Sequence, residues 1–211
     1  MTNTEKALEI LKRLYTVYPH PKIELNFTTP FELLVATILS AQCTDKLVNT
    51  VTPALFKKFK TAKNFADATV GDIDSLITKV TFHSNKAKNI RAAAKIIVEK
   101  HKGMVPQTME ELDALPGVAR KTANVVLGQA FGKAEGIVID THGIRLSNRL
   151  GLTTQKDPVK IERDLMELIP REKWIDFGSM LTLHGRHMCT ARPHTCEHCP
   201  LGDLCPEYFK N

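Results

Sequence analysis

The spacing of the apolar residues is the feature that most constrains the fold of this chain. In TPFELLVATILSAQ, residues 29–42, the apolar positions recur every three or four residues: Phe31, Leu34, Val35, Ile38 and Leu39. NKAKNIRAAAKIIVEK, residues 85–100, repeats the pattern with Ile90, Ala93, Ala94 and Ile97. This spacing places apolar side chains on one face of an α-helix. Only GIVID, residues 136–140, suggests a strand, and a single strand has no partner. We therefore predict an all-α fold.

Capping residues indicate where several of these helices begin. Three segments open with a cap residue and a favourable first turn: Thr29 with Pro30 and Glu32, Thr108 with Glu111, and Asp157 with Pro158. A threonine followed three residues later by glutamate predicts a capping box, in which each side chain accepts a hydrogen bond from the other residue's backbone. We expect such boxes at the first two of these helix starts.

Charge is distributed unevenly and favours a polyanionic partner. The net charge is +6; residues 1–135 carry 19 Lys and Arg against 13 Asp and Glu, whereas residues 136–211 carry ten of each. A local basic excess is typical of nucleic-acid binding; the alternative is a solvated surface of scattered lysines. No run reaches the ~18 apolar residues of a membrane helix. The N-terminal MTNTEKALEILKRLY has no signal-peptide core, so we expect a cytoplasmic protein.

Four of the five cysteines lie in the last 23 residues, with the spacing C-x6-C-x2-C-x5-C: Cys189, Cys196, Cys199 and Cys205. In a chain without an export signal, such a group indicates a metal site more often than disulfides. One C-x2-C pair with a single cysteine on either side suits an iron–sulfur cluster, and zinc is the alternative. The fifth, Cys43, is interpreted as a small buried apolar residue.

The stretch LPGVARKTANVV, residues 115–126, places two cations at the start of a predicted helix. Pro116 and Gly117 predict a turn, and Arg120 and Lys121 follow in the first helical turn. The positive end of the helix dipole disfavours cations there. A neighbouring cation and a positive helix end both ease the loss of a lysine proton, which an amine nucleophile requires.

The same stretch has two other interpretations. The cations could be exposed and without a role, and the backbone N–H groups of the turn could bind a phosphate. A phosphate-binding NTPase loop does not fit, because Arg120 stands where glycine must precede Lys121.

Several motifs, in the same order and with the same spacing, resemble the endonuclease III family of DNA glycosylases. They are the hairpin stretch, SAQCTD at 40–45, NKAKNI at 85–90, VIDTH at 138–142 and the four-cysteine pattern. The resemblance covers nearly the whole chain. It implies two helical lobes with a DNA-binding cleft between them. Residues 23–135 would form the lobe ending in a helix-hairpin-helix, and residues 1–22 and 136–211 the iron–sulfur cluster lobe.

The resemblance implies an enzyme of base excision repair. It would remove oxidised pyrimidines from duplex DNA and cleave the strand at the abasic site, acting as a monomer in the bacterial cytoplasm at the nucleoid. Lys121 would displace the base and form a Schiff base, followed by beta-elimination. Asp140 would take the lysine proton or stabilise the cationic sugar. Asp140 also precedes a predicted helix as an N-cap, and the two roles are compatible.

The resemblance also assigns the remaining site residues. The cysteines would hold a [4Fe–4S] cluster that fixes the C-terminal loop and takes no part in catalysis. Gln42 and Phe82 would fill the gap left by a flipped base; without the family pattern they would be a polar helix end and an ordinary core residue. The predicted DNA-binding residues are Gln42, Phe82, Gly117, Val118, Ala119, Arg120, His142 and Arg192.

Three positions depart from the family pattern: the first bears on how closely the backbone approaches a phosphate, and the other two bear on lesion preference rather than on the chemistry. Ala119 replaces the second hairpin glycine, Thr81, Phe82 and His83 replace Gly-Leu-Tyr, and Gly143 follows VIDTH. Two other functions were considered: an adenine-specific mismatch glycosylase and a non-catalytic DNA-binding module. The first branch lacks the hairpin lysine, and the second needs neither Lys121 nor Asp140.

Overall fold

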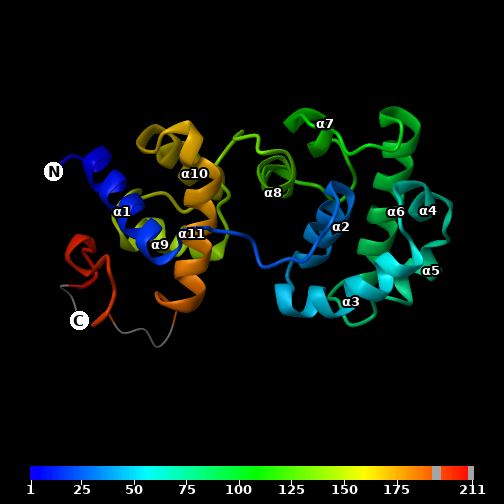
Figure 1. The fold of residues 1–211 in the computed structure, drawn as a ribbon, viewed down its shortest axis with the longest axis horizontal. Helices are drawn as coiled ribbons and strands as arrows, with labels where there is room; N and C mark the ends of the chain where they lie inside the picture. Colours follow the sequence, from blue (N-terminus) through cyan, green and yellow to red (C-terminus); the bar gives the residue numbers. More distant parts are fainter. Residues whose placement is uncertain (192–195, 209–211) are drawn as a thin grey trace. The chain divides into compact units, whose positions relative to one another are not determined.

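The computed structural model describes residues 1–191 and 196–208, and the regular secondary structure of this part consists of helices (Figure 1). No strand occurs among the described residues, and 136–140 is an irregular connection, so the all-α prediction is confirmed. The helices are α1 (Asn3–Val17), α2 (Pro30–Ser40), α3 (Asp45–Lys58), α4 (Ala62–Asp67), α5 (Val70–Asp74), α6 (His83–His101), α7 (Met109–Asp113), α8 (Arg120–Phe131), α9 (Thr141–Arg149), α10 (Pro158–Leu168) and α11 (Trp174–His187), with short 3-10 turns η1 (Arg171–Lys173) and η2 (Gly202–Leu204).

The chain forms two compact units. One is Glu24–Lys133, which contains α2 to α8; the other joins Met1–Ile23 to Ala134–Asn211. The predicted lobes change at 22/23 and 135/136, and the units of the structure change at Ile23/Glu24 and Lys133/Ala134. The roles assigned to the two lobes stay predictions. No helix in the described part of the chain is long and apolar enough to cross a membrane.

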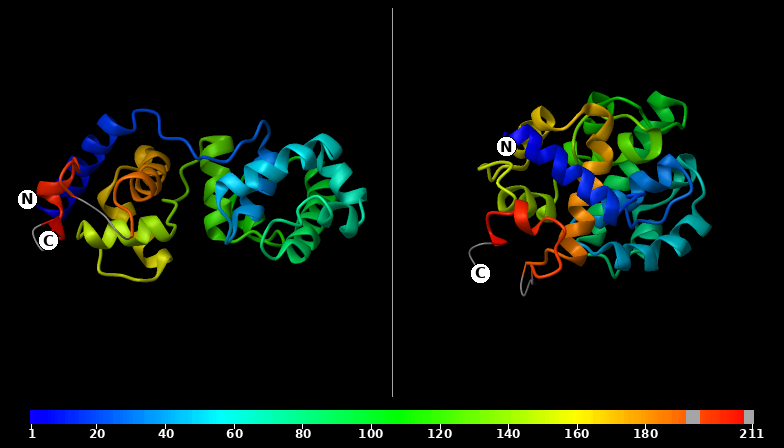
Figure 2. Two further views of the ribbon diagram at one scale, coloured as in Figure 1. Left: turned by 90° about the horizontal axis from the view of Figure 1, so that it is seen from below. Right: turned by 60° about the vertical axis from the view of Figure 1, so that its left-hand side comes forward.

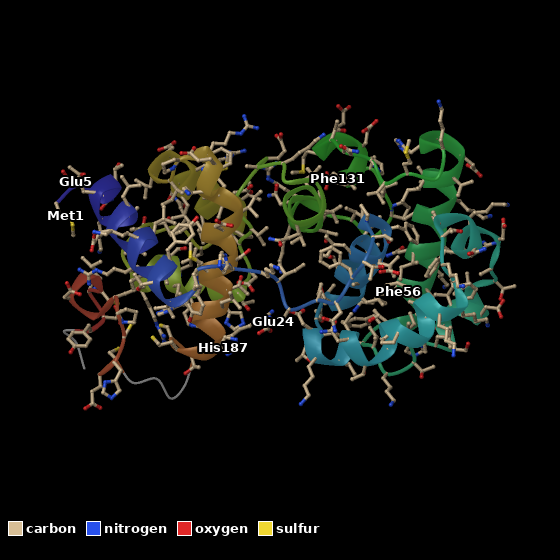
Figure 3. The ribbon with its side chains drawn as sticks, in the orientation of Figure 1. Met1, Glu5, Glu24, Phe56, Phe131 and His187 are labelled. Carbon is tan, nitrogen blue, oxygen red and sulfur yellow. The ribbon has the colours of Figure 1, made fainter. Side chains whose placement is uncertain are left out.

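Helix α2 is the centre of the unit Glu24–Lys133. It packs against α3, α6 and α8, and eight of its 11 residues are buried: Phe31, Leu33, Leu34, Val35, Ala36, Thr37, Ile38 and Leu39. The predicted stripe is confirmed, but burial extends around the helix, as expected for a helix covered on several sides. Figure 3 shows this unit with Glu24, Phe56 and Phe131 labelled.

Helix α6 is the longest helix of this unit and packs against α4, α5 and α2. Its predicted apolar face, Ile90, Ala93, Ala94 and Ile97, is buried, and Lys86 is buried with it. Phe82 precedes the helix and Lys102 follows it, both in the left-handed region, with φ values of 56° and 55°. The start of α6 is therefore a sharp change of direction built without glycine, whereas at its end Gly103 follows Lys102, also with a positive φ of 79°.

The other unit buries one face of α1 against the helices that come last in the sequence. Ala7, Ile10, Leu11 and Leu14 of α1 join a core made with residues of α9, α10 and α11. Helix α11 packs against α1 and α9, as two views of the ribbon show (Figures 1 and 2). This packing brings the first helix beside the segment that carries the four cysteines.

The helix starts are capped as predicted, but with different partners for the two glutamates. Thr29 accepts a hydrogen bond from the Glu32 backbone and Thr108 from the Glu111 backbone. The Glu32 carboxylate accepts instead from the backbone and hydroxyl of Thr28. The Glu111 carboxylate accepts from the hydroxyl of Thr108. The predicted capping boxes are therefore wrong in their second half. A complete box forms at Thr2 and Glu5, which begin α1 (Glu5 is labelled in Figure 3).

Candidate functional site

The hairpin between α7 and α8 depends on Gly117. Its φ is +78°, and a Cβ added there would lie 2.9 Å from the Cβ of Asn89 on α6. Both the backbone torsion and the close approach therefore require glycine. Val118 follows, with its backbone N–H donating to Leu115 O at 3.0 Å and its side chain buried. The predicted turn is present and rests on α6.

Helix α8 starts without a side-chain cap. Ala119 is the N-cap residue, with extended torsions of φ −111° and ψ 168°, and its side chain makes no capping hydrogen bond. Alanine adopts these torsions without strain, so the replacement of the second hairpin glycine leaves the turn intact. The first N–H groups of a helix that no cap side chain occupies form an anion-binding site.

Lys121 stands at the second position of α8, directly after Arg120, and its side chain is exposed. Residues 123–128 behind it are all buried, against α2 and α7. The predicted placement of two cations in a first helical turn is confirmed. Rigid packing of the helix thus presents an exposed amine at a positive helix end.

Asp140 is the N-cap of α9, and its Oδ1 accepts a hydrogen bond of 2.8 Å from the backbone of Gly143. The carboxylate is half-buried. A Cβ on Gly143 would meet ordinary contacts of 3.6–3.7 Å from Ile139 and Asp140, so the fold does not require glycine there. Asp140 is in the other unit from Lys121, and the pairing of the two residues stays a prediction.

His142 is held by close packing on α11. A Cβ on Gly185 would lie only 2.6 Å from the His142 Cβ. Arg145 lies beside it, with Nη2 3.2 Å from His142 Nδ1, and donates to Gly185 O and Cys189 O at 2.7 and 2.8 Å. His142 is therefore fixed in place and half-buried; its contact with DNA stays a prediction. Arg192 lies outside the described residues.

Gln42 and Phe82 share two unusual properties. Both side chains are exposed, Phe82 by 59%, and both backbones are in the left-handed region, with φ values of 57° and 56°. The interpretation of Phe82 as a core residue is therefore wrong. Exposed residues held in a disfavoured conformation are typical of functional sites. Both belong to the unit Glu24–Lys133.

Cys43 is not the buried apolar residue that its position suggests. It is half-buried, and its Sγ lies 3.3 Å from Thr81 N, 3.4 Å from Thr81 Oγ1 and 3.7 Å from Lys86 Nζ. Burial raises the pKa of the thiol, but the hydrogen bonds of Thr81 and the ammonium of Lys86 outweigh it and bring the pKa below its usual value. Lys86 and Thr81 are contacts that the sequence analysis missed. A lysine four residues before Ile90, on the apolar face of α6, was the available signal.

The four cysteines line one cavity beneath the C-terminal segment, together with Leu146, Arg149, Leu150, His184, Leu201, Gly202 and Glu207. Arg149 Nη1 donates to Cys189 Sγ at 3.1 Å, and Cys205 Sγ lies 3.4 Å from Arg149 O. Burial raises the pKa of Cys199, and the three other cysteines raise it further. The predicted ligands are thus gathered around one space. Across residues 1–191 and 196–208, however, no group of three or more His, Cys, Asp or Glu is placed to hold a metal ion.

Comparison with known proteins assigns a class to this fold and site. Residues 35–171 match the HhH-GPD superfamily base excision DNA repair protein model. The chain is 54% identical over 202 residues to the endonuclease III of Synechocystis sp., covering 96% of this chain and 92% of that protein. It is 43% identical over 203 residues to the endonuclease III of Escherichia coli K12, covering 96% of each. The fold and the hairpin are thus those of a helix-hairpin-helix base excision repair enzyme.

Solved structures of related proteins support the same assignment. A trapped endonuclease III–DNA covalent intermediate, an estranged-adenine complex, matches with a TM-score of 0.93 at 39% identity, covering 100% of this chain and 99% of that one. A thermostable thymine-DNA glycosylase, at 23% identity, shares the fold with a TM-score of 0.86. This chain belongs to the endonuclease III family.

Proposed function

We propose that this protein is a DNA glycosylase with abasic-site lyase activity that acts on oxidised pyrimidines in duplex DNA. The observation that carries the proposal is the exposed Lys121 at the uncapped start of α8, in the hairpin that follows Gly117. A related endonuclease III has been captured in covalent linkage to DNA. An amine presented at a positive helix end is suited to forming such a linkage.

Lys121 is the nucleophile of the reaction. Its neutral amine attacks the sugar C1′ while the bond between C1′ and the base breaks; the lysine nitrogen then loses a proton, and the departing base takes one up and leaves as the neutral base. Opening of the sugar ring gives a Schiff base between C1′ and the lysine nitrogen. Loss of a C2′ proton then breaks the bond between C3′ and its phosphate oxygen. Hydrolysis of the Schiff base frees Lys121 for another turnover.

Asp140 assists at the stage where the sugar becomes cationic. An oriented anion near a developing oxocarbenium stabilises the transition state. The bond from Gly143 N to Oδ1 holds the carboxylate in one orientation, so little reorganisation is needed during the reaction. The N-cap role and the catalytic role are therefore served by the same geometry.

Binding and base opening use the other predicted residues. The turn at Gly117 to Ala119 and the first N–H groups of α8 bind a DNA phosphate, with Arg120 beside them. Gln42 and Phe82 enter the duplex and occupy the space of the extruded nucleotide. Their exposure supports this role. His142 and Arg192 are proposed to contact DNA from the other unit.

We also propose that Cys189, Cys196, Cys199 and Cys205 hold a [4Fe–4S] cluster. Zinc gathers four sulfurs about 2.3 Å from a single ion, whereas a cluster spreads its ligands around four irons. The C-x6-C-x2-C-x5-C spacing and the four thiols that line one cavity support the cluster. Its role is to hold the C-terminal loop against α9 and α11. Broad visible absorption of the isolated protein tests this; a colourless protein with one bound zinc would contradict it.

The proposed reaction is tested with duplex DNA that carries a single oxidised thymine. We expect release of the free base together with strand scission, in equal amounts during the first turnover. Base release without scission would reduce the function to glycosylase alone. Binding without either product would leave a DNA-binding module. The protein is proposed to act as a monomer in the bacterial cytoplasm, on chromosomal DNA.

A further inference from the structure

Lys86 is a buried cation that the reaction does not use. Only 6% of the residue is exposed, although a lysine is almost never fully buried unless its charge is paired. Its ammonium donates to the backbone carbonyls of Leu39 at 2.7 Å and Ala41 at 2.5 Å, and lies 3.7 Å from Cys43 Sγ. All three donors of the ammonium thus point to the segment 39–43. This segment contains Gln42.

The carbonyls that Lys86 binds lie at the end of α2. The last carbonyls of a helix lack partners within the helix and carry partial negative charge. An ammonium there donates hydrogen bonds to these carbonyls and offsets their partial negative charge. An apolar side chain of the same length would leave the carbonyls without these donors. Burial lowers the pKa of Lys86, and nearby Cys43 partly opposes this. The Lys86 side chain therefore anchors the segment 39–43 to α6.

The same lysine is joined to Phe82 along α6. The Lys86 backbone N–H donates to Phe82 O at 3.1 Å, closing the first turn of the helix. A second connection runs through Cys43, whose Sγ accepts from the Thr81 backbone at 3.3 Å. Residues 81–82 and residues 42–43 are thus linked both through Lys86 and through Cys43.

We propose that Lys86 is a positioning residue that fixes Gln42 and Phe82 relative to one another, so that both enter the duplex together. This role rests on the proposed function. Lys86 contacts neither DNA nor the reacting atoms; it acts through the two loops that it joins. A pair of side chains that opens DNA by occupying one gap must keep a set separation, and both of these residues are on short loops with left-handed torsions.

The test compares Lys86→Met, which keeps the apolar stem and removes the ammonium, with Lys88→Met. Lys88 is an exposed lysine two residues further along α6, so it is a matched control. Cys43→Ala is a second variant that breaks the connection through the thiol and keeps Lys86. Base opening is followed by the fluorescence of 2-aminopurine placed beside an oxidised thymine in a duplex. Lyase activity is measured separately on a single-stranded abasic oligonucleotide, in which no base has to leave a stack.

We expect Lys86→Met to slow opening and base release in duplex DNA by about a hundredfold, the scale of a misplacement of ~1 Å. It should keep wild-type lyase activity on the single strand. Cys43→Ala should slow opening and base release in duplex DNA by a smaller factor. Lys88→Met should match the wild type. Combining Lys86→Met with Phe82→Ala should cost little more than Phe82→Ala alone, because both act on one step.

Wild-type opening and base release by Lys86→Met would overturn the positioning role. Equal losses on duplex and single-stranded DNA would also overturn it, because they indicate a general structural role. Failure of the wild-type protein itself to release base is a distinct result: it would overturn the proposed function and, with it, this role.

Discussion

At the scale of single residues, Phe82 combines a disfavoured backbone with a side chain that the fold does not bury. A bulky residue in the left-handed region costs on the order of 1–2 kcal/mol relative to the ordinary regions. The side chain is 59% exposed, so its burial contributes little stabilisation to offset this cost. Such strain at an exposed aromatic residue is explained by function better than by stability.

Phe82→Gly should therefore stabilise the fold and impair the reaction. Glycine adopts a φ of 56° without steric strain, so the free energy of unfolding should rise by roughly 1 kcal/mol. Base release from duplex DNA should fall, because no side chain fills the gap. Lys102→Gly is the control, since Lys102 has a φ of 55° at the other end of α6: it should stabilise the protein with activity unchanged. Denaturant unfolding and base-release rates check both; a destabilised Phe82→Gly would contradict the strain argument.

Asp140 has two roles that one substitution separates. Asparagine is as good an N-cap as aspartate, so Asp140→Asn should keep the hydrogen bond from Gly143 and the unfolding temperature. It removes the negative charge, and the rate of base release should fall by about 10²-fold or more. Asp140→Ala should lose activity and also about 1 kcal/mol of stability. Thermal unfolding alongside single-turnover kinetics distinguishes them. If Asp140→Asn kept full activity, Asp140 would be a cap and nothing more.

At the scale of elements, the hairpin illustrates how close packing sets a functional turn. The turn approaches α6 so closely that a Cβ on residue 117 would meet the side chain of Asn89 at 2.9 Å. The positive φ adds a second reason for glycine. The start of α8 is thereby fixed by α6, which also carries Lys86.

Gly117→Ala should disturb the hairpin through both effects. Left-handed torsions and the contact with Asn89 together should cost more than ~1 kcal/mol of stability. Binding to undamaged duplex DNA should weaken, because the turn no longer holds the start of α8 in place. Ala119→Gly is the matched control, since φ at that position is −111°; binding there should change little. Equal binding by both variants would indicate that the turn does not hold a phosphate.

Much of the element pattern could be predicted from the sequence, because it depends on local rules. The helix starts at Thr29, Thr108 and Asp157 follow from capping preferences, and the start of α8 follows from the Pro-Gly turn. The donors that hydrogen-bond to the carboxylates of Glu32 and Glu111 could not be predicted, since several donors lie within reach of a carboxylate in the first helical turn. The contacts of Lys86 could not be predicted either, because they join residues 39–43 to α6 across more than 40 positions of sequence.

At the scale of the whole chain, an ion pair connects the first helix to the cysteine-bearing segment. Arg13 of α1 donates to both carboxylate oxygens of Asp203, at 2.5 and 3.1 Å, and to Pro200 O at 3.0 Å. The hydrogen bond from Arg13 holds the pKa of Asp203 below its usual value. Residues 190 positions apart thus anchor the loop between Cys199 and Cys205.

This pair predicts a specific acid dependence. A lowered pKa in the folded state means that the stabilisation is present above the unfolded pKa of ~3.9 and is lost as the pH falls through the folded pKa. Asp203→Asn should lower the unfolding temperature at pH 6, and the difference from the wild type should shrink as the pH falls below about 4. Thermal scans of both proteins from pH 6 to pH 3 measure this difference in unfolding temperature. A difference that does not change with pH would mean that the pair is not the cause.

The measurement that tests the central claim most directly is covalent trapping with borohydride. The protein is mixed with duplex DNA that carries one oxidised thymine, and borohydride is added to reduce any Schiff base. We predict a stable protein–DNA adduct with the wild-type chain and none with Lys121→Gln, which should still bind the duplex. An adduct that persists in Lys121→Gln would place the nucleophile elsewhere. The absence of an adduct from the wild type, with tight binding retained, would contradict the assignment of lyase activity.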